Sequence, residues 1–290
     1  MKVGLVDLDT SHPAAFTPLL RELGHEVVGV WHHGPAEEFA AAHGIPQVFD
    51  RLEDMAEAVD LVVIGGADWS THVTRVAPFV AAGRAVFVDK PFAGNLADLR
   101  QLVSWAESGA RISGGSSLRW AAPQLDGDDR PEFALVGCSG HELDYGVHAY
   151  SLLHGILGPG MTRARWLGGC GQSRVEVGWD DGRTGMVSIG ETAARHPFHA
   201  TVLSGQSVSY HEISPDILYR TLLRVVVPYL AGEAPDPMPM RQLVEPELAA
   251  LAALVSRQQG GRWVSFDDDA MATVEYDGPG FAAAYRAARR

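Results

Sequence analysis

The chain has 290 residues, with 23 basic and 36 acidic side chains and a formal net charge of −13 at pH 7. Nucleic acids and anionic membranes both require a basic surface, so this charge argues against either as a partner. Only two cysteines occur, which excludes a disulfide framework and favours reduced thiols. No apolar run approaches the ~18 residues that span a membrane, and the N-terminus lacks a secretory pattern. We expect a cytoplasmic protein whose partner is a small molecule.

Residues 1–118 alternate strand and helix patterns. Short apolar runs predict strands at 2–6, 26–31, 61–64, 85–88 and 111–114, with helices between them, the clearest near 71–82 and 95–109. The first helix is predicted to begin after Ser11, with Pro13 in its first turn, and to end at Gly24. Strands alternating with helices of this length predict an α/β domain with a parallel, doubly wound Rossmann sheet.

The pattern changes in residues 119–290. A helix is predicted over 144–157, followed by strand-like runs separated by turns, among which Asp-Asp-Gly at 180–182 is a strong hairpin signal. Further helices are predicted at about 216–231 and 241–258, and the Ala- and Arg-rich tail is typical of a terminal helix. This half is predicted to be an α+β domain with a largely antiparallel, open sheet. An uncovered apolar sheet face favours a partner, so we expect a homo-oligomer.

The turn after the first strand carries no glycine. A dinucleotide-binding turn reads G-x-G-x-x-G, so that backbone N–H groups approach the pyrophosphate, but here Asp7, Asp9 and His12 stand in place of the glycines. The side chains of these acids are expected to crowd phosphates, and their charges are expected to repel them. At an effective dielectric near 20, two like charges about 5 Å apart repel with about 3 kcal/mol. Alternatively, the hydroxyls of Thr10 and Ser11 replace the glycines, and Asp9 is only a helix cap.

Acids and imidazoles follow several predicted strands, and parallel strands present their carboxyl ends to one crevice. The set is Asp7, Asp9 and His12 after the first strand, His32 and His33 after the second, Asp68 and His72 after 61–64, and Asp89 and Lys90 after 85–88. These are ligand types for zinc, manganese or iron. The spacing contains no His-x-x-x-His or Cys-x-x-Cys, and scattered His and Asp most often lie in solvated loops, so no metal site is assigned.

Two segments resemble the Gfo/Idh/MocA family of oxidoreductases. AGRAVFVDKPFAGN (82–95) is similar to the family pattern A-G-K-x-V-x-x-E-K-P-x-A, with Asp89 in place of Glu. DYGVHAYSLLHGILGPG (144–160) is similar to its D-x-G-x-H-x-x-D helix, with Ser151 in place of the last acid. The order of elements also fits this family, in which a Rossmann domain precedes an α/β domain with an open sheet.

The resemblance implies three catalytic residues. Lys90 would reach both the nicotinamide and the substrate, and His148 would exchange a proton with a substrate hydroxyl or carbonyl, supported by Asp144. Imidazole titrates nearest neutrality, and an ammonium group polarises the reacting oxygen. Asp144 and His148 are four residues apart, which places them on one face of the predicted helix. The alternative for His148 is an ordinary, satisfied helix histidine.

The cofactor implied by the resemblance is NADP or NAD. His32 lies at the position where an acidic residue usually binds the adenosine ribose. A protonated imidazole at that position favours a 2′-phosphate, so NADP(H) is expected to be less disfavoured than NAD(H). Arg119, Trp120 and Tyr145 are the expected substrate residues, with a surface ion pair and ordinary packing as the alternatives for the first two. The expected cofactor residues are Asp9, Thr10, Ser11, His12, His32, His33, Asp68, His72 and Lys90.

Two functions follow from these expectations. The first is oxidation of a hydroxyl or reduction of a carbonyl on a small sugar-like or cyclitol-like molecule. The second is a non-redox enzyme on the same scaffold, a lyase, isomerase or cyclase, that has lost the dinucleotide and uses Lys90 and His148 for acid/base chemistry. The glycine-free turn favours the second, and the family resemblance favours the first.

Overall fold

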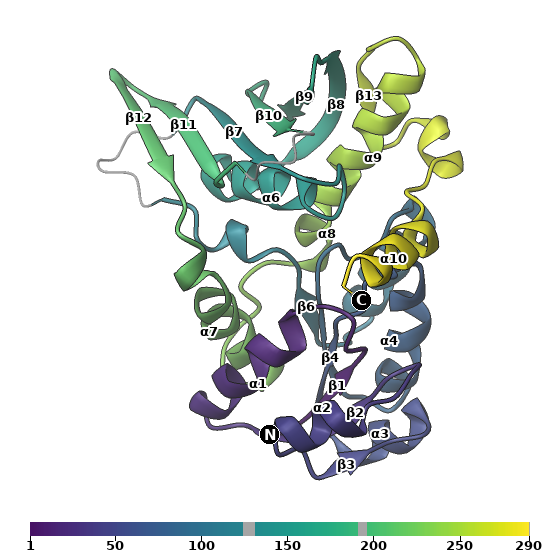
Figure 1. Cartoon of the computed structure of the whole chain (residues 1–290). Helices are drawn as coiled ribbons and strands as arrows, with labels where there is room; N and C mark the ends of the chain where they lie inside the picture. The colour runs from purple at the N-terminus through teal and green to yellow at the C-terminus, as the bar shows by residue number, and fades with distance from the viewer. Residues whose placement is uncertain (124–130, 191–195, 290) are drawn as a thin grey trace.

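The computed structural model describes residues 1–123, 131–190 and 196–289. The chain forms a six-stranded sheet and a seven-stranded sheet, which lie in the lower and upper parts of Figure 1. None of the described helices is long and apolar enough to cross a membrane.

The first sheet is parallel throughout, in the order β3-β2-β1-β4-β5-β6. This is the strand order of a Rossmann fold, so the doubly wound prediction is confirmed. Every residue of β4 and β5 is buried, as expected for central parallel strands with helices on both faces. The strands are β1 Lys2–Val6, β2 Glu26–Trp31, β3 Gln47–Val48, β4 Leu61–Ile64, β5 Ala85–Val88 and β6 Ile112–Gly114. The helices are α1 His12–Glu22, α2 Glu37–Ala42, α3 Leu52–Ala58, η1 Trp69–Thr71, α4 His72–Ala81, α5 Leu96–Glu107 and η2 Ser117–Arg119.

The second sheet has the order β12-β11-β7-β10-β9-β8-β13, and α6 and α9 pack against it. Only β7 and β10 pair in parallel, so the largely antiparallel prediction is confirmed, as is the hairpin at 180–182 between β9 and β10. The strands are β7 Phe133–Ser139, β8 Met161–Gly168, β9 Gln172–Trp179, β10 Thr184–Gly190, β11 His199–Ser204, β12 Ser207–Glu212 and β13 Val264–Ser265. The helices are α6 Gly146–Leu157, η3 Pro215–Ile217, α7 Leu218–Leu230, α8 Met240–Leu243, α9 Glu245–Gln258, η4 Asp269–Thr273 and α10 Gly278–Ala287.

One helix from the second half completes the first half's core. α7 packs against α1, β5 and β6, and its Leu222 and Val226 share a buried cluster with Leu5 and Phe16. The strands of the first sheet all lie before residue 115 and those of the second all lie after residue 132, while α7 returns to cover the Rossmann sheet (Figure 1).

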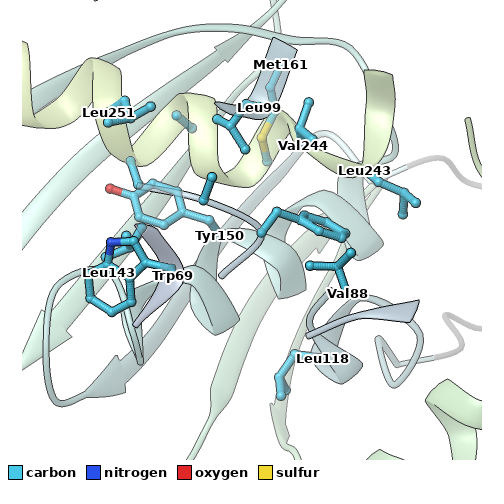
Figure 2. Packing of buried hydrophobic residues seen from close by; sticks show 14 of the residues in the cluster. Trp69, Val88, Leu99, Leu118, Leu143, Tyr150, Met161, Leu243, Val244 and Leu251 are labelled. Carbon is cyan, nitrogen blue, oxygen red and sulfur yellow. The ribbon is translucent and has the colours of Figure 1, made fainter. Parts of the chain in front are cut away.

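A second buried cluster joins the two sheets. Figure 2 shows residues of this cluster, among them Val88 at the end of β5, Leu118, Tyr150 of α6, Met161 of β8 and Leu251 of α9. Because these side chains are buried and interlocked, they fix the loop after β5 relative to the start of α6. Lys90 lies in that loop and His148 lies on that helix, so this core positions both.

Candidate active site

A cavity of about 990 Å³ lies between the carboxyl edge of the Rossmann sheet and the second half of the chain. Its size is at the upper end of the range for small-molecule sites, ~300–1,000 Å³. Seven of the expected site residues line it, namely Thr10, Ser11, His12, Lys90, Asp144, Tyr145 and His148. Residues that the sequence did not single out complete the wall, among them Tyr219 of α7 and Phe281, Tyr285 and Arg289 at the C-terminal end.

Lys90 and Asp144 form an ion pair at this cavity. Lys90 Nζ lies 2.7 Å from Asp144 Oδ1 and 3.1 Å from the Asp144 carbonyl oxygen. Burial opposes the charge of Lys90, but the carboxylates of Asp144 and Asp89 outweigh it and raise the pKa of the ammonium group. Lys90 is therefore a fixed cation, which suits it to polarise a substrate oxygen and not to accept a proton.

Ser116 holds His148, and Asp144 does not. His148 Nδ1 lies 2.7 Å from Ser116 Oγ, which also accepts the Leu118 N–H at 3.2 Å. Helix α6 begins at Gly146, so Asp144 lies in the turn before it, and the prediction that Asp144 and His148 share one helix face is wrong. Burial, with the nearby charges of Lys90 and His12, lowers the pKa of His148 well below 6.5. His148 is thus a neutral imidazole whose Nε2 is left for a ligand.

His12 brings a second imidazole to the cavity. Its Nδ1 is hydrogen-bonded to Oδ2 of Asp89, which is buried at the end of β5. Burial would raise the pKa of Asp89, but His12 and Lys90 outweigh it and the pKa is lowered. A carboxylate on Nδ1 fixes the orientation of an imidazole. The sequence placed both residues in the crevice, but it did not predict that they pair.

Asp7 adopts the left-handed backbone conformation that glycine favours, with φ 64°. Aspartate is among the few other residue types that enter this region. Its side chain is buried, with Oδ1 3.0 Å from His33 Nδ1 and 3.3 Å from His32 Nδ1, and Arg75 Nη1 lies 2.9 Å from Oδ2. Burial would raise the pKa of Asp7, but the bond to His32, the charge of Arg75 and the bond to His33 together lower it.

Asp9 is paired with the C-terminal helix. Arg286 Nε and Nη2 donate to Asp9 Oδ1 and Oδ2 at 2.8 and 3.1 Å, and Arg289 Nη1 donates to the Asp9 carbonyl at 2.9 Å. The helix cap is Ser11, so the prediction that Asp9 caps α1 is wrong. Neither Asp7 nor Asp9 lines the cavity. The expected repulsion of phosphates is reduced, because neither carboxylate lines the cavity and an arginine pairs with each.

The acids and imidazoles predicted to meet in the crevice do so in part. Single ligand atoms of Asp7, Asp9, His32 and His33 all lie within 4.8 Å of one another. Each carboxylate already contacts a guanidinium group, so a divalent cation would have to displace two ion pairs. The cluster is therefore a balanced ion network, and we assign no metal to it.

Five of the expected cofactor residues do not line the cavity, namely Asp9, His32, His33, Asp68 and His72. Asp68 caps η1 through a 3.1 Å bond from the Ser70 N–H. His72 is fully buried, with its ring nitrogens 3.2 and 3.1 Å from the carbonyl oxygens of Phe92 and Gly66. His72 thus holds the backbone two residues beyond Lys90 and does not contact a ligand in this cavity.

The expected substrate residues Arg119 and Trp120 also lie outside the cavity lining. The Arg119 guanidinium is buried and donates to the carbonyl oxygens of Leu243 and Gln242 at 2.7 and 3.3 Å. Trp120 packs against both buried clusters. Of the three expected substrate residues, the structure brings only Tyr145 to the cavity, 5.8 Å from Lys90 Nζ.

The residues present fit the phosphate side of a dinucleotide. Helix α1 points its N-terminus at the cavity through Thr10, Ser11 and His12. The N-cap Ser11 makes no side-chain cap bond, and Thr10 Oγ1 accepts the His12 N–H at 3.3 Å. A helix N-terminus of this kind attracts phosphate through its backbone N–H groups and its dipole. Arg289 places a cation on the facing wall.

The strand order defines a Rossmann fold followed by a second, mostly antiparallel sheet. The cavity has Lys90 and His12 at the carboxyl edge of the parallel sheet. Residues 3–113 match the model of the family GFO_IDH_MocA, described as "Oxidoreductase family, NAD-binding Rossmann fold". This part of the chain is thus similar to the Gfo/Idh/MocA family.

Known relatives resemble part of the chain in sequence, and solved structures resemble more than nine-tenths of it in fold. Trans-1,2-dihydrobenzene-1,2-diol dehydrogenase of Oryctolagus cuniculus is 39% identical over 87 residues, which are 29% of this chain and only 26% of that enzyme. Scyllo-inositol dehydrogenase of Lactobacillus casei, solved with NAD(H) and scyllo-inositol, superposes with a TM-score of 0.75 at 15% identity, over 92% of this chain and 99% of that one. GenD2 from gentamicin A biosynthesis, solved with NAD, gives 0.75 at 18% identity, over 91% and 96%. These two structural likenesses show a common fold.

Proposed function

We propose that the protein is an NAD(P)-dependent oxidoreductase that oxidises a hydroxyl, or reduces a carbonyl, of a small sugar-like or cyclitol-like molecule. The observation that carries the proposal is the meeting of Lys90 and His148 in one cavity that begins at the N-terminus of α1. The rabbit relative is named as a dehydrogenase of a ring diol, and the Lactobacillus casei neighbour was solved with a cyclitol. Both names support a polyol-like substrate.

Thr10, Ser11 and the N-terminus of α1 would hold the phosphates of NADP or NAD, and Lys90 would lie at its reactive end. When bound, the nicotinamide accepts or supplies the hydride. The Lys90 ammonium binds the substrate oxygen and favours the ionised form of a hydroxyl. His148 exchanges the hydroxyl proton at Nε2, while Ser116 fixes its ring through Nδ1. Asp144 positions Lys90.

The first test is calorimetric titration of the protein with NADH and NADPH. The second is dinucleotide reduction at 340 nm with a panel of cyclitols and sugars. Lys90→Met and His148→Ala should each lower turnover by about a hundredfold or more, in the range of general acid–base contributions. The matched controls Lys2→Met, at the only other lysine, and His43→Ala, outside the cavity lining, should retain activity. If the folded wild-type protein binds neither dinucleotide, the proposal is wrong.

One observation favours the non-redox alternative, a lyase, isomerase or cyclase. The His12–Asp89 pair adds a second oriented imidazole beside His148, and hydride transfer needs only one acid/base. In that case the sugar panel would be transformed without any change at 340 nm. His12→Ala and His148→Ala would then abolish the transformation to a similar degree.

We also propose that the protein is cytoplasmic and forms a homo-oligomer. Cys138 and Cys170 are free thiols, in keeping with a reducing compartment. Val208 and Tyr210 of the edge strand β12 are 70% and 62% exposed, which supports a contact between copies. Light scattering after gel filtration gives the number of subunits, and a monomer would contradict this part of the proposal.

A further inference from the structure

The end of the chain forms one wall of the cavity. Phe281, Tyr285, Ala288 and Arg289 line it, and their spacing places them along one face of α10 and the turn that follows it. In Figure 1 this helix lies between the two sheets, with the C-terminus beside it. Two bonds from Arg286 to Asp9 hold this helix against the turn after β1.

The two arginines at this end have different roles. Arg286 is committed to Asp9 through two bonds, and Asp9 is only 5% exposed, so this pair anchors the helix. Arg289 is exposed and reaches the carbonyl oxygen of Asp9 at 2.9 Å. Within the described part of the chain, that bond uses one of the five N–H donors that a guanidinium offers. Its charge is 4.9 Å from the Tyr285 ring, which limits where it can move.

The glycine-free turn makes such a cation useful. His12 lines the cavity with a side chain where a glycine would leave the backbone open, and Thr10 Oγ1 already accepts its N–H, so fewer backbone N–H groups reach a pyrophosphate. The α1 N-terminus supplies only about half a positive charge. Arg75 and Arg286 are paired with Asp7 and Asp9. Arg289 lines the cavity together with Thr10 and Ser11, where the phosphates of the proposed cofactor would lie.

We infer that Arg289 binds the pyrophosphate of the dinucleotide, so that a cation from the chain's last turn replaces the glycine-rich cradle. Arginine suits this task, because its planar fork pairs with two phosphate oxygens at once. This inference rests on the proposed function and adds a binding residue to it.

The test compares Arg289→Ala with the wild-type protein by calorimetric titration of NADH and of ADP-ribose. ADP-ribose carries the pyrophosphate without the nicotinamide, so both ligands should lose affinity by the same factor. We expect a loss of about ten- to a hundredfold, the range for a charge-assisted hydrogen bond, and a weaker dependence on salt. Arg289→Lys keeps the charge and should recover part of the affinity. Arg100→Ala, at an exposed position of helix α5, is the matched control and should bind like wild type.

Each result has a distinct meaning. Because Arg289 is exposed, its loss should leave thermal unfolding unchanged, whereas loss of Arg286 would leave the buried Asp9 without its partner. If Arg289→Ala binds both ligands as wild type does, the inference is wrong and the proposed function stands. If it binds them more tightly, Arg289 competes with the phosphates and the inference is again wrong. If wild type binds neither ligand, both the inference and the proposed function fail.

Discussion

Replacing Asp7 with glycine restores the residue type that a dinucleotide turn normally carries, yet we expect the variant to be less stable. Asp7 has φ 64°, a conformation that costs a residue with a Cβ about 1 kcal/mol and that glycine adopts without strain. Its carboxylate also balances Arg75, which is 13% exposed, and it contacts His32 and His33. Relief of strain and loss of the ion network therefore act in opposite directions.

The ion network should outweigh the strain. Removing one partner of a buried ion pair destabilises a protein by about 3–5 kcal/mol, because the other charge stays buried without compensation. Subtracting about 1 kcal/mol for the relieved backbone leaves a net loss of about 2–4 kcal/mol. Asp7→Asn should lose a similar amount, since asparagine also tolerates the left-handed region but carries no charge.

Urea unfolding followed by tryptophan fluorescence at pH 7 measures these differences, with the exposed Asp50→Gly as the control for adding a glycine. The pKa of Asp7 is lowered from 3.8 in the folded protein. Its contribution to the free energy of unfolding is therefore complete above pH 3.8 and is lost as the pH falls through the folded pKa. The gap between wild type and Asp7→Asn should therefore close only in acid. A glycine variant as stable as wild type at pH 7 would refute the assignment of Asp7 to a stabilising network.

Three further predictions concern the site and its supports. Ser116→Ala should lower kcat by about tenfold with little change in KM, because His148 loses the hydrogen-bond partner of its Nδ1. Ser116→Thr keeps a hydroxyl and should restore kcat. An unchanged kcat and an unchanged pH profile in Ser116→Ala would contradict this positioning role. Burial raises the pKa of Glu247 from 4.5 to about 7. Its contribution to the free energy of unfolding is therefore complete below pH 4.5 and is lost as the pH rises through 7, by at most about 3 kcal/mol. In urea unfolding at pH 5 and pH 8, Glu247→Gln should remove this pH dependence. Zinc should not raise the Tm of the protein above that in EDTA, because arginines already balance Asp7 and Asp9; a rise of several degrees would contradict the ion-network assignment.

The fold could be predicted from the sequence because its signals are local. The runs that form β4 and β5 are apolar at every position, which is typical of central parallel strands and sets them apart from the alternating pattern of β9. The helix boundary at Asp144 was less predictable. Nothing in the local pattern shows that the Asp144 carboxylate turns back to Lys90, so that α6 starts only at Gly146.

The sequence predicts which residues lie at the cavity where strand ends decide their position, but not where side-chain partners decide it. Lys90 and His12 follow strands whose carboxyl ends share one edge, so topology alone brings them to the cavity. Arg119 looked equally suitable, but its buried guanidinium is used by the carbonyl oxygens of Leu243 and Gln242. Those acceptors lie more than 120 residues away, and single-sequence patterns carry no signal for such a pairing.

The same limit explains why the acids of the first turn were misjudged. The effect of a carboxylate on a ligand depends on the sum of nearby charges, and the cations that balance Asp7 and Asp9 come from helix α4 and from the last helix of the chain. A repulsion estimated from these two positions alone omits both arginines and so overstates the repulsion of phosphate. The turn after β1 thus lacks the glycine-rich backbone that binds pyrophosphate, and it carries instead acidic side chains that pair with arginines from distant elements. Its ability to hold phosphate should therefore depend on residues near position 289 as much as on those near position 9, which the arginine variants measure directly.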